Sequence, residues 1–407
     1  MSTTTMQSAP AIEAASLALG THLGDQPAVA TLRAAAAAAA SALPMPTRIE
    51  RPWKYLDLSD FDLSGYQPGL EGDFTFVSPA LDGLTLSQFS GAQSPAAEII
   101  ARNLASVVPV ARSKFTALHY AFMRGGALIA AAANVEVKEP VRIVREYTAA
   151  NQLATPHTLI VAGANSVVNV IEDCRSSEED ILVLPVVEII PGPGAQVRYT
   201  VLHRWGSQTR VFVEQRTVTE RDSSVVSMSL AAGGLVVKSH IESSLAGRGS
   251  SSELYGVNIG DGAEHVDAYT TQDHIAADTR SDLLFKSALR GESRAVYYGL
   301  TRVGLGAKNA DANQENRNLL LSEYAKADSD PVLEILTNDV IRVSHGATAG
   351  PVDEEQLYYL QARGIPRPEG EALLVRGFLG QVLDRVTDEA LREELAAALD
   401  EKLEAGA

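Results

Sequence analysis

The chain has 407 residues, 45% of them hydrophobic and 21% charged, so it is long enough to bury one large core or several smaller ones. Its formal net charge of −17 disfavours nucleic acid and anionic membranes as main partners, because both bind basic surfaces. The single cysteine, Cys174, excludes an internal disulfide and a metal site built from several thiolates of one chain.

The N-terminal region, residues 1–115, is expected to be mainly helical. It lacks the basic start and compact apolar core of a secretory signal, which predicts a cytoplasmic protein. A helix is predicted from Pro27 to Leu43, with Pro44 just beyond its end. The segment that follows, RPWKYLDLSDFDLSGY, carries aromatic residues that either anchor this region to the core or dock a partner.

The middle region, residues 116–345, is rich in Val, Ile, Thr and Ser and predicts a β-structure. Its short runs include HTLIVAG, SVVNVIE, ILVLPVVEII and QVRYTVLHRW, and several alternate apolar with polar residues, as half-buried strands do. No helix-length amphipathic segment lies regularly between them, which argues against repeated βαβ units.

A weak glycine repeat runs through this region. The pattern G-x-G-A begins at Gly192, Gly260 and Gly304, and a looser copy begins at Gly247. The separations of 68 and 44 residues are near multiples of about 22, a repeat length that a parallel β-helix could use. A β-sandwich is the competing interpretation, and these glycines are interpreted as turns and not as a dinucleotide fingerprint.

The C-terminal region, residues 346–407, predicts amphipathic helices. Asp353 has the features of an N-cap, Gly364 those of a helix stop, and Thr387 those of a second N-cap. These helices could cap the open end of a solenoid or present a surface to a partner.

Three common catalytic motifs are missing from the sequence. It contains no G-x-S-x-G, no H-E-x-x-H and no phosphate-binding loop, so ATP hydrolysis by this chain is not expected. Cys174, beside Glu172 and Asp173, is expected to be a buried thiol with a raised pKa.

One polar cluster leaves an alternative open. Histidines and acids gathered within 14 residues could bind a cation or cleave a polysaccharide on a β-helix, or could simply face solvent. They are His265, Asp267, Asp273, His274 and Asp278. A stand-alone β-helix that binds or cleaves carbohydrate is therefore the alternative function.

A long series of motifs resembles the SufB/SufD family of iron–sulfur cluster assembly proteins. The matching stretches are Asn316-Arg317-Asn318, P-x-LEI from Pro331, SHGAT-x-G from Ser344, DEE-x-L-x-YL-x-x-RGI from Asp353 and RGFL from Arg376. Weaker matches are PWKYLDL and FTALHYAFMRGGALI. The low cysteine content resembles the SufD branch of the family more than the SufB branch.

The resemblance implies a mainly β fold with a right-handed parallel β-helix core between N-terminal and C-terminal α-helical domains. It implies a non-catalytic scaffold in the SUF complex, which pairs with a SufB-like subunit through the β-helix and docks a SufC-like ABC ATPase through the C-terminal helices. A transient Fe–S cluster would form at the interface with SufB, and this chain alone would bind no cofactor tightly. Participation of a flavin is left open, and so is a homodimer of the isolated chain.

The resemblance also implies specific site residues. His345 would contribute to the interfacial cluster, and Val343 stands where many family members have a cysteine, so any thiolate would come from SufB. The residues implied in partner binding are Leu357, Tyr358, Arg363, Arg376, Gly377, Phe378 and Leu379.

Overall fold

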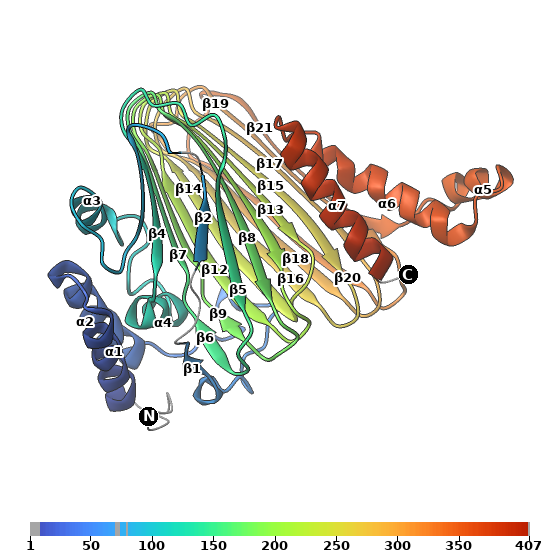
Figure 1. Cartoon of the computed structure of the whole chain (residues 1–407). Helices are drawn as coiled ribbons and strands as arrows, with labels where there is room; N and C mark the ends of the chain where they lie inside the picture. The colour runs from blue at the N-terminus through green and yellow to red at the C-terminus, as the bar shows by residue number, and fades with distance from the viewer. Residues whose placement is uncertain (1–8, 70–73, 79, 406–407) are drawn as a thin grey trace.

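The fold, seen in a computed structural model, is a parallel β-solenoid of about 8 turns with helices at both ends (Figure 1). This confirms the predicted fold class, a mainly β protein with a parallel β-helix core flanked by α-helices. The structure describes residues 9–69, 74–78 and 80–405; the first eight residues of the N-terminal stretch considered above lie outside these ranges.

The N-terminal region combines helices with short strands. Its elements are α1 (Ala9–Leu23), α2 (Pro27–Ala42), the 3-10 helices η1 (Arg51–Trp53) and η2 (Leu63–Gly65), β1 (Gln67–Pro68), β2 (Phe74–Val77), β3 (Leu84–Gln88), α3 (Ala96–Asn103) and α4 (Lys114–Phe122). The predicted alanine-rich helix is confirmed as α2, which begins at Pro27 and ends one residue before the predicted end.

The solenoid consists of two sheets that the chain visits alternately. One sheet, called here sheet A, contains β4 (Gly126–Ala131), β7 (His157–Ala162), β10 (Val186–Pro191), β12 (Arg210–Val218), β14 (Val236–Leu245), β16 (His265–His274), β18 (Arg294–Val303) and β20 (Lys326–Ile335), with β6 (Gln152–Ala154) and β9 (Leu182–Val183) beside it. The other, sheet B, contains β5 (Val141–Tyr147), β8 (Val167–Ser176), β11 (Gln196–Arg204), β13 (Ser224–Ala231), β15 (Ser251–Gly260), β17 (Arg280–Leu289), β19 (Ala310–Leu320) and β21 (Val340–Pro351).

The length of one turn corrects the repeat that the glycines suggested. Val236 pairs with His265, and His265 pairs with Arg294, so each of these turns takes 29 residues. The shortest and longest offsets between strands β11 and β21 are 26 and 32 residues, and the estimate of about 22 was wrong. The reason is that Gly192 and Gly304 lie where the chain passes from sheet A to sheet B, whereas Gly260 lies at the opposite corner.

The corner between sheet A and sheet B is a ladder of left-handed residues. One residue per turn has φ between 55° and 76°, and its backbone N–H donates to a carbonyl of the next corner along the solenoid. The seven are Asn134, Asn165, Gly194, Asp222, Gly249, Asp278 and Asn309. Gly, Asn and Asp are the residue types that tolerate this conformation, so the ladder explains why they recur at this corner.

The apolar core is divided into layers. One cluster fills the space between the sheets in the first turns and includes Ile143 and Val168. A second lies between sheet A and the N-terminal helices, where Trp53 and Phe61 pack against Phe115 and Phe212. The aromatic segment around Trp53 is therefore an anchor to the core. A third cluster lies between sheet B and the C-terminal helices.

The C-terminal region contains α5 (Glu354–Ala362), α6 (Arg367–Leu383) and α7 (Glu389–Ala405). Asp353 caps α5 as predicted, because its carboxylate accepts from the backbone N–H groups of Glu355 and Gln356. The predicted cap at Thr387 was wrong: Asp388 accepts from the N–H of Leu391 at 2.9 Å. No helix in the described ranges is long and apolar enough to cross a bilayer.

Candidate functional site at the open end of the solenoid

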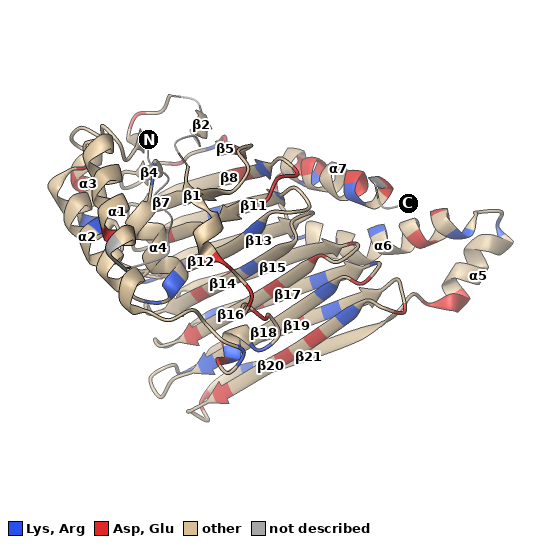
Figure 2. Cartoon of the chain, turned by 90° about the horizontal axis from the view of Figure 1, so that it is seen from below, with Lys and Arg blue, Asp and Glu red and all other residues tan. Residues whose placement is uncertain are grey.

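The two ends of the solenoid differ. At the first turn, β2 and β3 pair antiparallel with β5 and β4, and helices cover sheet A. At the last turn, β20 pairs with β18 alone and β21 with β19 alone among the strands that the structure describes, so one edge of each is unpaired (Figures 1 and 2). Unpaired strand edges carry free backbone donors and acceptors, so this end can accept further strands.

His345 lies on β21 at this open end. The hydroxyl of its neighbour Ser344 donates to Asn313 Oδ1 at 2.8 Å, and Asn313 in turn donates to Asp282 on the helix-covered face of sheet B. Since side chains alternate along a strand, His345 faces the other side, the mouth of the solenoid. It is exposed, and its ring makes no hydrogen bond within the described residues, so both nitrogens are available to a ligand.

A polar layer lies beneath His345. Gln314, its partner on β19, accepts from Thr301 at 3.0 Å and donates to the carbonyl of Gly299 at 2.9 Å. Beside it, Asn316 Oδ1 accepts from Asn318 at 2.8 Å and from Ser329 at 2.6 Å. Hydrogen-bonded carboxamides therefore replace the aliphatic core of the earlier turns next to the open end.

Cys174 is far from His345. It lies on β8, and six strand spacings of sheet B separate β8 from β21, which corresponds to about 29 Å at the usual 4.8 Å between strands. Its thiol is buried, and burial, followed by the charge of Glu172, raises its pKa well above the ordinary value, as predicted. Cys174 is therefore a neutral thiol that cannot reach a metal held at His345.

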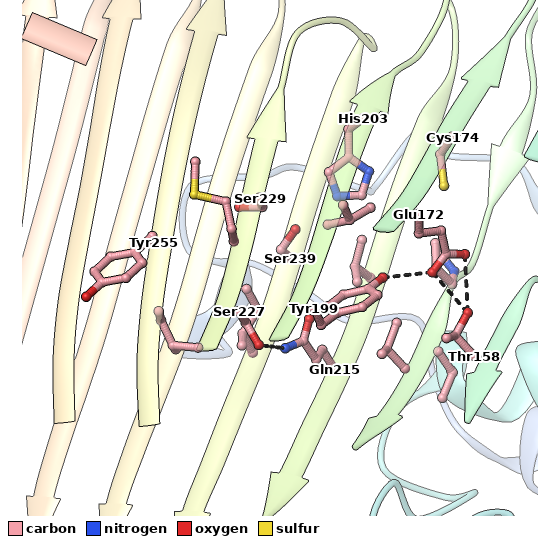
Figure 3. A pocket seen from close by; sticks show the side chains of 18 of the residues that line it. Thr158, Glu172, Cys174, Tyr199, His203, Gln215, Ser227, Ser229, Ser239 and Tyr255 are labelled. Atoms are coloured by element: carbon pink, nitrogen blue, oxygen red, sulfur yellow. Dashed lines mark hydrogen bonds between the residues drawn. The ribbon is translucent and has the colours of Figure 1, made fainter. Parts of the chain in front are cut away.

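Cys174 lines a small interior cavity (Figure 3). The cavity has a volume of about 20 Å³, which is room for about one water molecule. Glu172 lies beside it and accepts from Tyr199 at 2.9 Å and from Thr158 at 3.0 Å. Leu254 and Phe285, which lie between the sheets in the later turns, also line this cavity. The cavity is thus bounded by apolar residues on the side of the open end.

The histidines and acids from His265 to Asp278 do not form a common site. His274 lies inside the solenoid and hydrogen-bonds Thr279 and Ser281, both at 2.8 Å, whereas Asp267 lies on the outer face and pairs with Lys238 at 2.7 Å. Asp278 belongs to the corner ladder. Nowhere in the described part of the chain do three or more His, Cys, Asp or Glu residues come together to hold a metal ion. No geometry here favours the carbohydrate alternative.

Comparison with known proteins identifies the family. Residues 145–378 match the family described as "SUF system FeS cluster assembly, SufBD core domain". The chain belongs to the SufBD family. It is a SufD-like iron–sulfur cluster assembly protein.

Individual relatives agree with this assignment. The chain is 31% identical to the iron–sulfur cluster assembly protein SufD of Bacillus subtilis (strain 168) over 301 residues, which cover 73% of this chain and 68% of that protein. It is 31% identical to a SufBD family protein of Mycobacterium tuberculosis (strain H37Rv) over 225 residues, 54% of this chain and 57% of the relative. With a SufBD family protein of Staphylococcus aureus (strain MRSA252) it shares 27% identity over 344 residues, 82% and 74% of the two chains.

The SufBD core match contains the open end of the solenoid and most of α6. Within it, Val343 lies two residues before His345 on the same side of β21 and packs in a small cluster with Val303, Ala307 and Ala310. At this position, where the family resemblance places a cysteine, the chain has an aliphatic packing residue that cannot ligate iron.

The residues implied in partner binding differ in how exposed they are and in what they contact. Leu357 and Leu379 are fully buried inside the chain, so they can support a docking surface but cannot touch a partner. Tyr358 is 72% exposed. Arg376 pairs with Asp400 of α7, and the backbone carbonyl of Phe378 accepts from Lys286 of β17 at 2.9 Å. Gly377 has open space around its α-carbon.

Of the exposed aromatic residues on α5, the sequence analysis named Tyr358 and missed Tyr359. Figure 1 shows α5 extending away from the solenoid, in contact with α6. Tyr359 is 57% exposed beside Tyr358, with the guanidinium of Arg363 over its ring at 4.9 Å from the centroid. The stretch LYYLQ carried the signal, because two adjacent aromatic residues cannot both face the single neighbouring helix.

Proposed function

We propose that this chain is a non-catalytic scaffold subunit that pairs with a SufB-like subunit at the open end of its solenoid and helps to hold a nascent Fe–S cluster there. The observation that carries the proposal is the position of His345, exposed and without a ring partner, on the unpaired last strand of a SufBD core domain. The cluster is the cargo of this assembly and not a resident cofactor.

Pairing at the open end is supported by its exposed apolar residues. Ile341 on β21 is 71% exposed and Ile335 on β20 is 44% exposed, next to unpaired strand edges. Large exposed aliphatic side chains beside free backbone groups are typical of surfaces that another sheet covers. A partner solenoid that adds strands to both sheets would satisfy the backbone groups and bury these side chains together.

Iron binding at this interface needs ligands from both subunits. An imidazole suits iron and replaces cysteine in some [2Fe–2S] centres. Because Val343 has no ligating atom and Cys174 lies about 29 Å away in the interior, the thiolates of the site must come from the partner. One histidine alone would hold a cluster only transiently.

Docking of a SufC-like ATPase is proposed for the surface formed by α5 and the adjoining part of α6. This surface presents Tyr358, Tyr359 and the partly exposed Leu373, and aromatic side chains of this kind often anchor interfaces. The rest of α6 is fixed to sheet B, since buried Lys286 donates to Phe378 O and to Gln381. A displacement of α5 by a bound ATPase would therefore be transmitted through α6 to the solenoid.

The test is to co-express the chain with a SufB-like and a SufC-like subunit and to measure complex mass and bound iron. His345→Ala should leave the mass of the complex unchanged while iron and sulfide per complex fall at least several-fold. His22→Ala, which removes an exposed histidine on α1, is the matched control and should change neither.

Two results would contradict the proposal at different points. Failure of the wild-type chain to form a complex would remove the partner assignment. Formation of the complex with equal iron in wild type and His345→Ala would leave the scaffold function intact but remove His345 as a ligand.

A further inference from the structure

A cleft lies between the outer face of sheet B and the corner that joins α6 to α7. It has a volume of about 380 Å³, which is within the range of small-molecule pockets. Strands β8, β11, β13 and β15 form its floor, and the segment from Arg385 to Leu391 forms its wall. Among the described residues, its lining includes none from β20, β21 or α5, so it is separate from the surfaces considered above.

Three side chains of the floor carry hydrogen-bond donors without a partner among the described residues. Arg198 on β11 is exposed and forms neither an ion pair nor a hydrogen bond there. Thr200, on the same strand, is 6% exposed, and its hydroxyl also has no such partner. Asn169 lies opposite Arg198 on β8, and its Oδ1 is buried without a partner, which leaves the amide N–H group at the cleft. A hydroxyl buried as far as that of Thr200 is normally hydrogen-bonded, which indicates that a ligand completes the site.

The spacing of these donors suits one small acceptor group. Tyr199 packs between the sheets, so Arg198 and Thr200 on either side of it both point outward into the cleft. Neighbouring strands lie about 5 Å apart, and alternate residues of one strand lie about 7 Å apart, so the three donors reach a common point. A carboxylate accepts hydrogen bonds only, and a guanidinium binds it through two parallel hydrogen bonds.

The charges of the cleft favour a ligand with a single negative charge. The two acids that line it have partners of their own: Glu253 accepts from Tyr255 at 2.8 Å, and Asp388 accepts from the N–H of Leu391 at 2.9 Å. Glu253 lies two strands from Arg198, about 10 Å at the usual spacing. Because both acids repel further negative charge, a carboxylate fits the cleft better than a phosphate dianion.

The remainder of the lining is largely apolar. Val226 and Met228 on β13 and Leu391 of α7 belong to the core cluster between sheet B and the C-terminal helices, and all three line the cleft. The second guanidinium, that of Arg385, faces Asp282 at 3.6 Å and is therefore already engaged. The cleft thus fits a ligand that has one anionic end and an apolar body.

We propose that this cleft binds a small organic acid, whose carboxylate is held by Arg198, Thr200 and Asn169 and whose apolar part lies against Met228. The bound acid would lie between sheet B and the corner from α6 to α7, and it would supply the hydroxyl of Thr200 with the partner that the chain itself does not provide. The inference does not depend on the scaffold function proposed above.

The direct test is NMR on the full chain with ¹³C-labelled methionine methyl groups. Met228 lines the cleft, whereas Met123 is 3% exposed in the core of the N-terminal region. We expect hexanoate or benzoate to shift the Met228 signal, assigned through Met228→Leu, in a saturable way and to leave the Met123 signal unchanged. Hexanamide, the neutral counterpart of hexanoate, should bind at least several-fold more weakly. The proposal is wrong if neither acid gives a saturable shift, or if hexanamide binds as well as hexanoate.

Variants locate the carboxylate. Arg198→Gln should raise the Kd of the acid at least about tenfold, because it removes a charge-assisted hydrogen bond. Thr200→Val, which keeps the shape of the side chain but removes its hydroxyl, should weaken binding several-fold. The matched control is Arg280→Gln, because Arg280 is exposed on β17, on the same face of sheet B but outside the cleft, and its Kd should equal that of the wild type. An unchanged Kd in Arg198→Gln, or an equal rise in both arginine variants, would overturn the proposal.

Discussion

Arg145 and Glu172 form an ion pair inside the solenoid, between sheets that are otherwise apolar in this turn. Their side chains are 1% and 5% exposed. Arg145 also donates to the carbonyl of His157 at 3.0 Å and to Thr158 at 3.1 Å, while Glu172 accepts from Tyr199. Charges removed from water this completely are tolerated only when both partners are present.

Removal of one partner should be costly. Glu172→Gln leaves the Arg145 guanidinium without a counter-charge, and we expect the free energy of unfolding to fall by about 3–5 kcal/mol. Asp278→Asn, which weakens the solvent-screened pair with Arg248, should cost much less. Urea denaturation of both variants measures the difference, and similar losses would show that the interior pair is hydrated.

Two buried histidines predict sensitivity to mild acid. Burial lowers the pKa of His203 and of His274 to about 4, so both are neutral in the folded chain, and Nδ1 of His203 accepts from Trp205 at 3.1 Å. An unfolded histidine takes up a proton below about pH 6.5, so each group should destabilise the fold by about 2 kcal/mol between pH 7 and pH 5. His203→Gln and His274→Gln should each reduce the stability difference between these pH values by that amount in urea titrations. An unchanged difference would mean that these rings are charged when folded.

At the scale of elements, the left-handed residues of the corner ladder join each turn of the solenoid to the next through backbone hydrogen bonds. Gly249 has φ of 76°, and a Cβ built there would lie 2.4 Å from Oδ1 of Asp222. Gly249→Ala should therefore lower the unfolding free energy by about 1–2 kcal/mol. Gly65→Ala is the control, because Gly65 has no atom within 4 Å of its added Cβ, and its cost should be within about 0.5 kcal/mol. Equal costs in thermal or urea unfolding would show that the corner adapts without strain.

At the scale of the whole molecule, the unpaired edges of β20 and β21 make the isolated chain prone to self-association. Ile341→Lys places a charge on the last strand and should shift any dimer to monomer in light scattering at a fixed protein concentration. Ile49→Lys is the control, because Ile49 is 94% exposed but lies in the N-terminal region. A dimer that survives Ile341→Lys but not Ile49→Lys would place the contact elsewhere.

Much of this architecture follows from local patterns in the sequence. Alternation of apolar and polar residues predicts the strands, Pro27 with the alanines that follow predicts α2, and Asp353 predicts the start of α5, because each pattern acts through contacts within a few residues. The motifs around His345 indicated the family that the SufBD core match then showed.

Tertiary structure decided what depends on residues far apart in the chain. The repeat length could not be read from the glycines, because which corners stack is set by hydrogen bonds between strands 26–32 residues apart. The unpaired edges of the last turn and the distance of Cys174 from His345 likewise depend on how the turns stack. Spacing along the sequence carries no information on which turn lies beside which, and only the packing of the solenoid supplies it.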